Sequence, residues 1–419
     1  MHNKSATVFK LYTIMVIIGL VSCSNTPPTS TPLLSVTVPS IPLPKSTPVS
    51  TSTEFPNDVV KNQCFEILPA LPPEITLPGI LVLSKPDGLS LLKFNQQTRR
   101  EIPGLIHGVG TSPDRKWLSY VFIAEDVEEK LVIESADGKI QAEVPTQQGW
   151  LIFDKALWLD KERLWFPVFP DLKRGQVAPT VVLNPFTGDQ QELTSDYPDI
   201  EQYQIGFASS PRLHFGYSSV VYHPLLNLVI YPQLAEDGWY IVLWDRQFEK
   251  ILVKIPDGGL YGHMPLWLPN GNHFVVVARR DWNSPREWLI VSQDGEIQQL
   301  THFEDLYPQF EIGNYASVSR DGHYLAFGLS QNTHNNDATS DDPKQLTILD
   351  LDTLEVFNTC ITSSYPEPVW SPDSEYIAVL TRGPSKRPSS IVILNIKQVW
   401  AAKIEEDPKV IPVDWLKSP

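Results

Sequence analysis

The sequence predicts an all-β protein made of repeated four-stranded sheets, and three observations lead to this fold class. Short polar turns recur between apolar runs, as in VWSPDSEYIAVL at 369–380. The chain is rich in residues that strands favour, with 12 Trp and 14 Tyr. The residues before the turns recur at steps of 47, 64, 45, 51, 52 and 45 positions. They are Thr111, Trp158, Tyr222, Trp267, Val318, Trp370 and Trp415. Repeats of this length are typical of a β-propeller, in which each unit supplies one blade.

Each repeat has the order of one blade. An apolar inner strand reaches a turn in which Pro fixes φ and Asp, Asn or Gly supplies the turn chemistry. A second apolar strand returns, such as 376–380, and a third ends in another polar turn, as in EWLIVSQDGE at 287–296. A shorter, more polar fourth strand follows. Such a unit cannot bury both faces alone, so the units are expected to stack and close a ring.

The two ends of the chain are expected to share one blade. The first full inner strand begins near His107, and the segments GILVLSKPDG and LSLLKFNQQT before it resemble outer strands without an inner one. VIPVDWL near the C-terminus resembles an inner strand without outer ones. Seven inner strands predict a seven-bladed β-propeller closed by N- and C-terminal strands.

The turn phrases resemble the TolB-type repeat, a WD-like propeller repeat with an aromatic residue, then Ser-Pro-Asp-Gly, then an apolar strand. The resemblance covers about 79–419. It is strongest at 370–373 and 112–114, and weak at Trp158 and Tyr222, where the turn residues differ. Six blades are usual for TolB-type propellers, so six remains the alternative count. In this reading the Ser-Pro-Asp turn is structural.

The N-terminus resembles a bacterial lipoprotein signal. MHNKSATVFK is followed by a run of about a dozen mostly apolar residues, which suits a signal-peptide core better than a membrane span. The run ends in Leu-Val-Ser-Cys, similar to the lipobox, so 1–22 is the predicted signal peptide and Cys23 the lipidated residue. An ordinary secretory signal is the alternative.

A tether is predicted between this cysteine and the propeller. Pro, Ser and Thr fill 21 of the 31 positions from 26 to 56, so the segment cannot bury a core and should be extended. We therefore divide the chain into the signal at 1–22, a tether at 23–60 and the propeller at 61–419.

Cys64 and Cys360 are the remaining cysteines. Outside the cytoplasm two such thiols commonly pair, so we expect a disulfide from the end of the tether to a strand near the C-terminus. Two buried, unpaired thiols are the alternative.

The charge of the chain excludes one class of partner. The formal net charge is -16, which repels phosphate backbones, so no nucleic-acid partner is expected. Attachment to a membrane is expected through the lipid. The sequence contains no Gly-x-Ser-x-Gly, His-Glu-x-x-His or phosphate-loop motif, so no catalytic residue, metal or cofactor is assigned.

A polar ring is the first candidate ligand site. Positions four residues before the aligned residues would surround one mouth of the central channel. Those with polar side chains are His107, Asp154, Ser218, His263 and Asn314. Such a ring could bind a divalent metal or a small polar ligand, whereas the simpler interpretation is that strand starts at a wet channel mouth are often polar. Some pectin-degrading lyases of the wider propeller superfamily hold a metal in this way, but the resemblance stops at the fold.

Arg280 and Trp282 form the second candidate site. They lie in a predicted loop between second and third strands, and Arg and Trp dominate interface hot spots. The sequence thus predicts a lipid-anchored module outside the cytoplasm, in the cell envelope, that binds a protein or an envelope polymer. A secreted polysaccharide lyase or hydrolase with its site at the channel mouth is the alternative.

Overall fold

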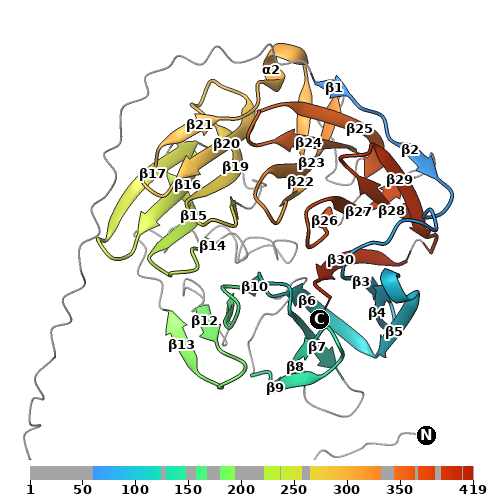
Figure 1. Cartoon of the computed structure of the whole chain (residues 1–419). Helices are drawn as coiled ribbons and strands as arrows, with labels where there is room; N and C mark the ends of the chain where they lie inside the picture. Colours follow the sequence, from blue (N-terminus) through green and yellow to red (C-terminus); the bar gives the residue numbers. More distant parts are fainter. Residues whose placement is uncertain are drawn as a thin grey trace, which may run out of the picture. The chain divides into compact units, whose positions relative to one another are not determined.

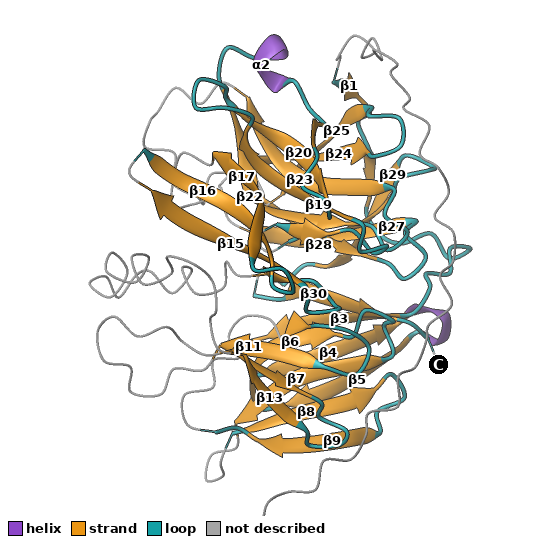
Figure 2. Ribbon diagram, turned by 90° about the vertical axis from the view of Figure 1, so that its left-hand side faces the viewer, coloured by secondary structure: helices purple, strands orange, loops and turns teal. Residues whose placement is uncertain are grey.

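The described part of the chain is almost entirely β-strand (Figures 1 and 2). The computed structural model describes residues 60–123, 129–147, 157–167, 180–193, 221–235, 237–256, 265–331, 344–363, 367–382, 388–407 and 409–418. These residues belong to one compact unit that begins at Phe55. Within them, no helix has the length and apolar character needed to cross a membrane. The predicted signal, Cys23 and nearly all of the tether lie outside the described residues.

Apart from β1 (Lys61–Asn62) and β2 (Glu66–Leu68), the described strands form seven antiparallel sets of four. Two of these sets belong to one ten-stranded sheet because β25 (Val356–Ser363) also pairs with β27 (Tyr376–Arg382). Set one is β30 (Ile411–Leu416), β3 (Ile80–Lys85), β4 (Gly88–Lys93) and β5 (Thr98–Pro103). Set two is β6 (Leu105–Thr111), β7 (Trp117–Ile123), β8 (Lys130–Ser135) and β9 (Ile140–Pro145). Set three is β10 (Leu157–Trp158), β11 (Leu164–Pro167), β12 (Thr180–Leu183) and β13 (Gln190–Leu193). Set four is β14 (Val221–Tyr222), β15 (Leu228–Ala235), β16 (Gly238–Asp245) and β17 (Lys250–Pro256).

The remaining sets follow the same order. Set five is β18 (Leu266–Trp267), β19 (His273–Arg279), β20 (Arg286–Ser292) and β21 (Ile297–Gln299). Set six is β22 (Phe310–Val318), β23 (Tyr324–Gln331), β24 (Lys344–Asp350) and β25 (Val356–Ser363). Set seven is β26 (Val369–Trp370), β27 (Tyr376–Arg382), β28 (Pro388–Asn395) and β29 (Trp400–Glu405). A short helix, α2 (Phe303–Leu306), precedes set six, and a 3-10 turn at Phe94–Gln96 joins β4 to β5.

Hydrophobic clusters between neighbouring sets form a closed circuit. One cluster joins sets one and two, five more join each later pair in turn, and the seventh joins set seven back to set one. β19 shows how one strand serves two clusters. Phe274, Val276 and Ala278 pack toward set four, whereas Val275 and Val277 pack toward set six. Because alternate residues of a strand point to opposite faces and both faces are covered, these strands are continuously apolar.

The all-β propeller class and the shared set are confirmed. β30 pairs with β3 in a register that includes Leu81 opposite Trp415, so the two ends of the propeller complete one sheet. The Trp415 indole also donates to the Pro78 carbonyl at 2.6 Å. The count of seven blades stays a prediction, since residues 194–220 between β13 and β14 lie outside the described part.

The recurring turn is held by its own side chains. The Ser371 hydroxyl lies 2.5 Å from Asp373 and accepts the backbone N–H of Tyr376 at 3.0 Å. The same pattern occurs at Ser319 and Ser112. These turns join the first and second strands of each set, and the turns between third and fourth strands lie at the same end of the sheet. We call this end the turn face and the opposite end the loop face.

A strap formed by residues 61–68 crosses the outer edges of sets six and seven (Figure 1). β1 (Lys61–Asn62) runs parallel to β25, and β2 (Glu66–Leu68) runs parallel to β29. Between them Phe65 is buried in the cluster that joins the two sets. The sequence did not predict these two strands, because their partners lie about 300 residues away and the segment carries no alternating pattern.

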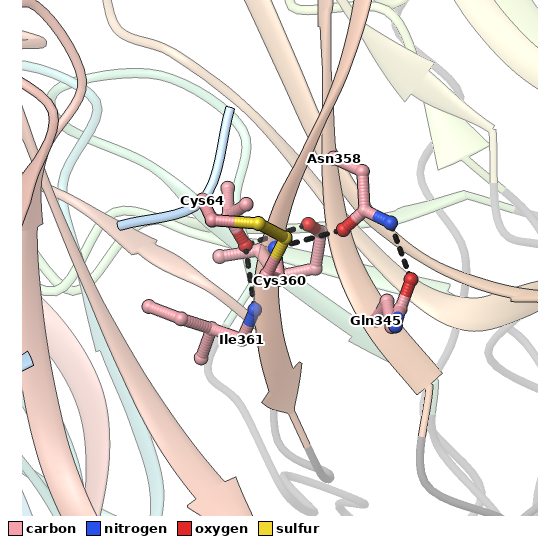
Figure 3. The surroundings of a disulfide bond; sticks show 7 residues. Cys64, Gln345, Asn358, Cys360 and Ile361 are labelled. Atoms are coloured by element: carbon pink, nitrogen blue, oxygen red, sulfur yellow. Dashed lines mark hydrogen bonds between the residues drawn. A yellow bond between two sulfur atoms is a disulfide. The ribbon is translucent and has the colours of Figure 1, made fainter. Parts of the chain in front are cut away.

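The strap is closed by the predicted disulfide. Cys64 is bonded to Cys360 of β25 (Figure 3), with their Cα atoms 4.8 Å apart. The Cys360 N–H donates to the Asn358 side-chain oxygen at 2.8 Å, and the Asn358 amide in turn contacts Gln345. This disulfide confirms the predicted pairing of the two cysteines.

Loss of the disulfide should destabilise the propeller. Because the bond closes a loop of 296 residues, Cys64→Ser is expected to lower the free energy of unfolding by up to about 5 kcal/mol. The measurement is urea unfolding with and without reductant. The reductant should shift the midpoint of the wild type toward that of the variant and leave the variant unchanged. An unchanged midpoint on reduction of the wild type would contradict the role of the bond.

Candidate functional site

The structure describes the side chain of one member of the predicted polar ring. His107 lies in β6, where its Nε2 is 3.9 Å from Glu129 Oε1 and both side chains are more than one-third exposed. Asp154, Ser218 and His263 lie outside the described residues. Asn314 lies in β22, and its side chain is not described. The ring therefore stays a prediction.

Arg280 and Trp282 lie in the loop between β19 and β20, as predicted, but they have different surroundings. Arg280 is exposed, with its Nε 3.9 Å from an Asp281 carboxylate oxygen. Trp282 reaches the neighbouring set, where its indole N–H lies 3.2 Å from the Tyr240 hydroxyl. The two rings meet edge to face, with centroids 5.2 Å apart.

Polar side chains lie next to the Tyr240–Trp282 pair, and the backbone at Gly238 supports the indole. The Tyr240 hydroxyl donates to Asp237, and this bond lowers the pKa of the Asp237 carboxyl and raises the pKa of Tyr240. Lys254 lies 5.9 Å from the centre of the Tyr240 ring. Gly238 lies directly under Trp282, where a Cβ atom would approach the indole to 2.5 Å. The indole therefore sits on bare backbone at the tip of the β15–β16 hairpin, and both rings remain partly exposed.

A second cluster, which the sequence analysis missed, lies where inner strands end at the turn face. Asp414 of β30 is buried and accepts the N–H and hydroxyl of Thr111 at 3.0 and 2.8 Å. The Arg115 guanidinium forms an ion pair with the same carboxylate. Arg320 comes from set six and lies 3.7 Å from the carboxylate.

This cluster joins three sets through one carboxylate. Asp414 belongs to set one, Thr111 and Arg115 to set two, and Arg320 to the turn after β22 in set six. Arg115 is in the left-handed backbone region, with φ of 64°, yet its side chain is buried. The only signal in the sequence was an Asp inside an otherwise apolar inner strand, and nothing in the repeat spacing points to its partners. The cluster closes the ring, and we assign it no ligand.

A buried carboxylate in set five is also structural. Burial raises the pKa of Glu287 to about 7. Its two oxygens accept the Thr301 hydroxyl at 2.6 Å and the Glu304 N–H at 3.0 Å, which holds the first turn of α2. Both oxygens have hydrogen-bond partners within the fold, and burial is the largest cause of the raised pKa. Glu287 is therefore a structural residue.

The described residues contain no group of three or more His, Cys, Asp or Glu side chains able to hold a metal ion. Asp154 and His263 lie outside this part of the chain.

Comparisons with known proteins show the fold. No protein-family profile and no curated protein sequence matches the chain. Among solved structures, an oligogalacturonate lyase from Vibrio parahaemolyticus aligns over 79% of this chain and 86% of its own, with a TM-score of 0.50 and 9% identity. At this identity the likeness concerns the propeller fold alone.

Two TolB structures align less closely. The putative TolB of Agrobacterium tumefaciens covers 72% of this chain and 96% of its own, with a TM-score of 0.41 and 14% identity. TolB of Acinetobacter baumannii covers 81% and 80%, with a TM-score of 0.40 and 14% identity.

The Asp414 cluster makes a prediction about stability. Asp414→Asn leaves Arg115 buried without a carboxylate, so the free energy of unfolding should fall by about 3–5 kcal/mol. Replacing both groups, in Asp414→Asn with Arg115→Met, should recover much of this loss. Urea unfolding of the two single variants and the double variant measures the coupling.

The matched control is Asp352→Asn, because that carboxylate contacts the exposed His323. Its change should stay within about 0.5 kcal/mol. If the loss in the double variant equals the sum of the losses in the two single variants, the Asp414–Arg115 ion pair does not contribute to closing the ring.

Proposed function

We propose that this chain is a lipid-anchored propeller of the cell envelope that binds a protein or an envelope polymer. The observation that carries the proposal is the covalent link between the end of the predicted tether and the ring. Cys64 is fixed to Cys360, and the strap around it pairs with two sheets. Structural disulfides persist mainly in oxidising compartments, which supports a place outside the cytoplasm.

The proposed anchor and the strap complement each other. An acylated Cys23 would bind the membrane through its acyl chains, and each buried CH₂ contributes about 0.8 kcal/mol. The tether would link the ring to the bilayer. Because the disulfide joins residue 64 to the ring covalently, tension on the tether would reach the sheets without peeling the strap away beyond that residue.

The proposed binding surface is the loop face, at Arg280 and the Tyr240–Trp282 pair. The aromatic pair is partly exposed and packed on backbone, so it can contact a partner at little cost in side-chain entropy. The exposed guanidinium of Arg280 belongs to the same loop as Trp282. Trp, Tyr and Arg are the residue types most often found at the centre of interfaces. His107 of β6 and Glu129, which directly precedes β8, add polar groups on this face.

The lyase or hydrolase alternative depends on the ring position of His107, Asp154 and His263. The side chains of Asp154 and His263 lie outside the described residues, so the alternative stays a prediction.

The anchor is tested by removing the predicted lipidation site. Cys23→Ser should move the protein from the membrane fraction to the soluble fraction, because no acyl chain can be attached. Fractionation followed by immunoblotting measures the distribution. As a control, Cys64→Ser should remain in the membrane fraction although it lacks the disulfide. A Cys23→Ser protein that stays with the membrane would contradict the lipid anchor.

The binding surface is tested by crosslinking in isolated envelopes. A chain with both Arg280→Ala and Trp282→Ala should lose crosslinked products that the wild type forms, because the proposed anchor residues are gone. Its thermal unfolding should show that the fold is retained. The matched control on the turn face is Lys116→Ala with Lys139→Ala, two exposed cations whose loss should leave the products unchanged. Identical products from all three proteins would contradict this surface.

A further inference from the structure

Exposed apolar side chains gather on the turn face of one part of the ring. Seven large hydrophobic residues are exposed in the described part of the chain, and five belong to the turn face of sets two to five. These five are Ile140, Phe186, Leu225, Phe248 and Ile297, with exposed fractions of 54%, 37%, 75%, 66% and 39%. The other two lie elsewhere, Leu105 at the start of β6 on the loop face and Ile67 on the strap. We call the five residues the apolar arc.

The two most exposed members of the arc lie in two turns that are bonded to each other. Leu225 is in the turn after β14, and Phe248 is in the turn after β16. Arg246 joins these turns, because its N–H donates to the Asn227 carbonyl at 2.9 Å and its guanidinium donates to the Leu226 carbonyl at 2.9 Å. The two apolar side chains are therefore held at the surface by turns that cannot move independently.

The chain reaches the ring at the same face. Lys61 pairs with Phe357, the second residue of β25 and part of its turn-face end, and the Lys61 amine contacts Glu355 in the turn before that strand. From there the strap runs parallel to β25, toward the loop face. A chain that arrives from a membrane anchor would therefore meet the propeller at the end that carries the apolar arc.

We propose that the apolar arc lies against the phospholipid bilayer that holds the N-terminal anchor. This inference rests on the lipid anchor of the proposed function and adds an orientation to it. The 36 residues from 24 to 59 could span roughly 100 Å if extended, so the tether permits this contact without enforcing it. The apolar side chains would supply the preference, and the loop face would then point away from the membrane.

A bilayer fits the arc better than a protein groove does. The five residues come from four sets and are spread over separate turns, which suits a broad surface. Lys250 lies 5.8 Å from the centre of the Phe248 ring and can extend its amine toward the headgroups. The chain is acidic overall, so the contact should form on zwitterionic lipid and should not need anionic lipid.

Site-specific fluorescence in vesicles tests the orientation. The full mature chain carries Leu225→Cys, Phe248→Cys or Leu105→Cys, labelled with a polarity-sensitive dye while Cys64 and Cys360 stay bonded. Each protein is reconstituted through its lipid into phosphatidylcholine vesicles that contain spin-labelled lipid. Labels at 225 and 248 should shift to shorter wavelength and be quenched. The label at 105, exposed on the loop face, should match its spectrum in water.

The two proposals fail in different ways in this experiment. Co-flotation with the vesicles reports the anchor, and quenching reports the orientation. Flotation with labels at 225 and 248 in a watery environment would overturn the docking of the arc and leave the anchor intact. Equal quenching at all three positions would also overturn it, because the face would not be selective. Protein that does not float would contradict the lipid anchor itself, and the docking inference would fall with it.

Discussion

The pairing of β30 with β3 is the constraint on which the rest of the structure depends. Each strand set has two apolar faces and needs a neighbour on both, so an open series would leave two faces exposed to water. β30 brings Trp415 into the cluster between sets seven and one, and Leu416 into the cluster between sets one and two. β30 thus completes the two hydrophobic clusters that lie on either side of set one. Asp414 directly precedes these two residues and is the only buried carboxylate in that strand.

The turn residues have a second role beyond the turn itself. At several junctions a turn of one set is bonded to the turn of the next. The bonds run from Arg163 to the Pro224 carbonyl, from His223 to the Gly271 carbonyl, and from the Asp321 N–H to the Ser374 hydroxyl. Burial lowers the pKa of His223, which favours the neutral imidazole. A neutral imidazole can donate from Nε2 to the Gly271 carbonyl while Nδ1 accepts the Leu225 N–H. The repeat is recognisable in the sequence because these positions serve both the turn and the neighbouring set.

The sequence predicted those features that depend on local pattern. The repeat steps and the unpaired apolar runs at both ends gave the propeller and the shared sheet, and the count of cysteines gave the disulfide. The strap and the Asp414 cluster were missed for one physical reason: each joins residues far apart in the chain through backbone pairing or side-chain reach. Trp282 was found as a surface residue, but its contact with Tyr240 depends on the absence of a side chain at Gly238, which spacing does not reveal.

The two faces of the ring are suited to different tasks. The turn face consists of short turns bonded from set to set, so a change in length there would break contacts with a neighbour. Loops at the other face vary more in length, from two residues between β3 and β4 to six between β19 and β20. Lengthening such a loop costs little free energy because closure entropy grows slowly with length. Sets six and seven are tied further by the pairing of Ser363 with Thr381, by the strap and by the disulfide. The proposed attachment would therefore reach the ring at a part of the rim held by strand pairing and a disulfide, and the proposed partner recognition would use the face whose loops can change without opening the ring.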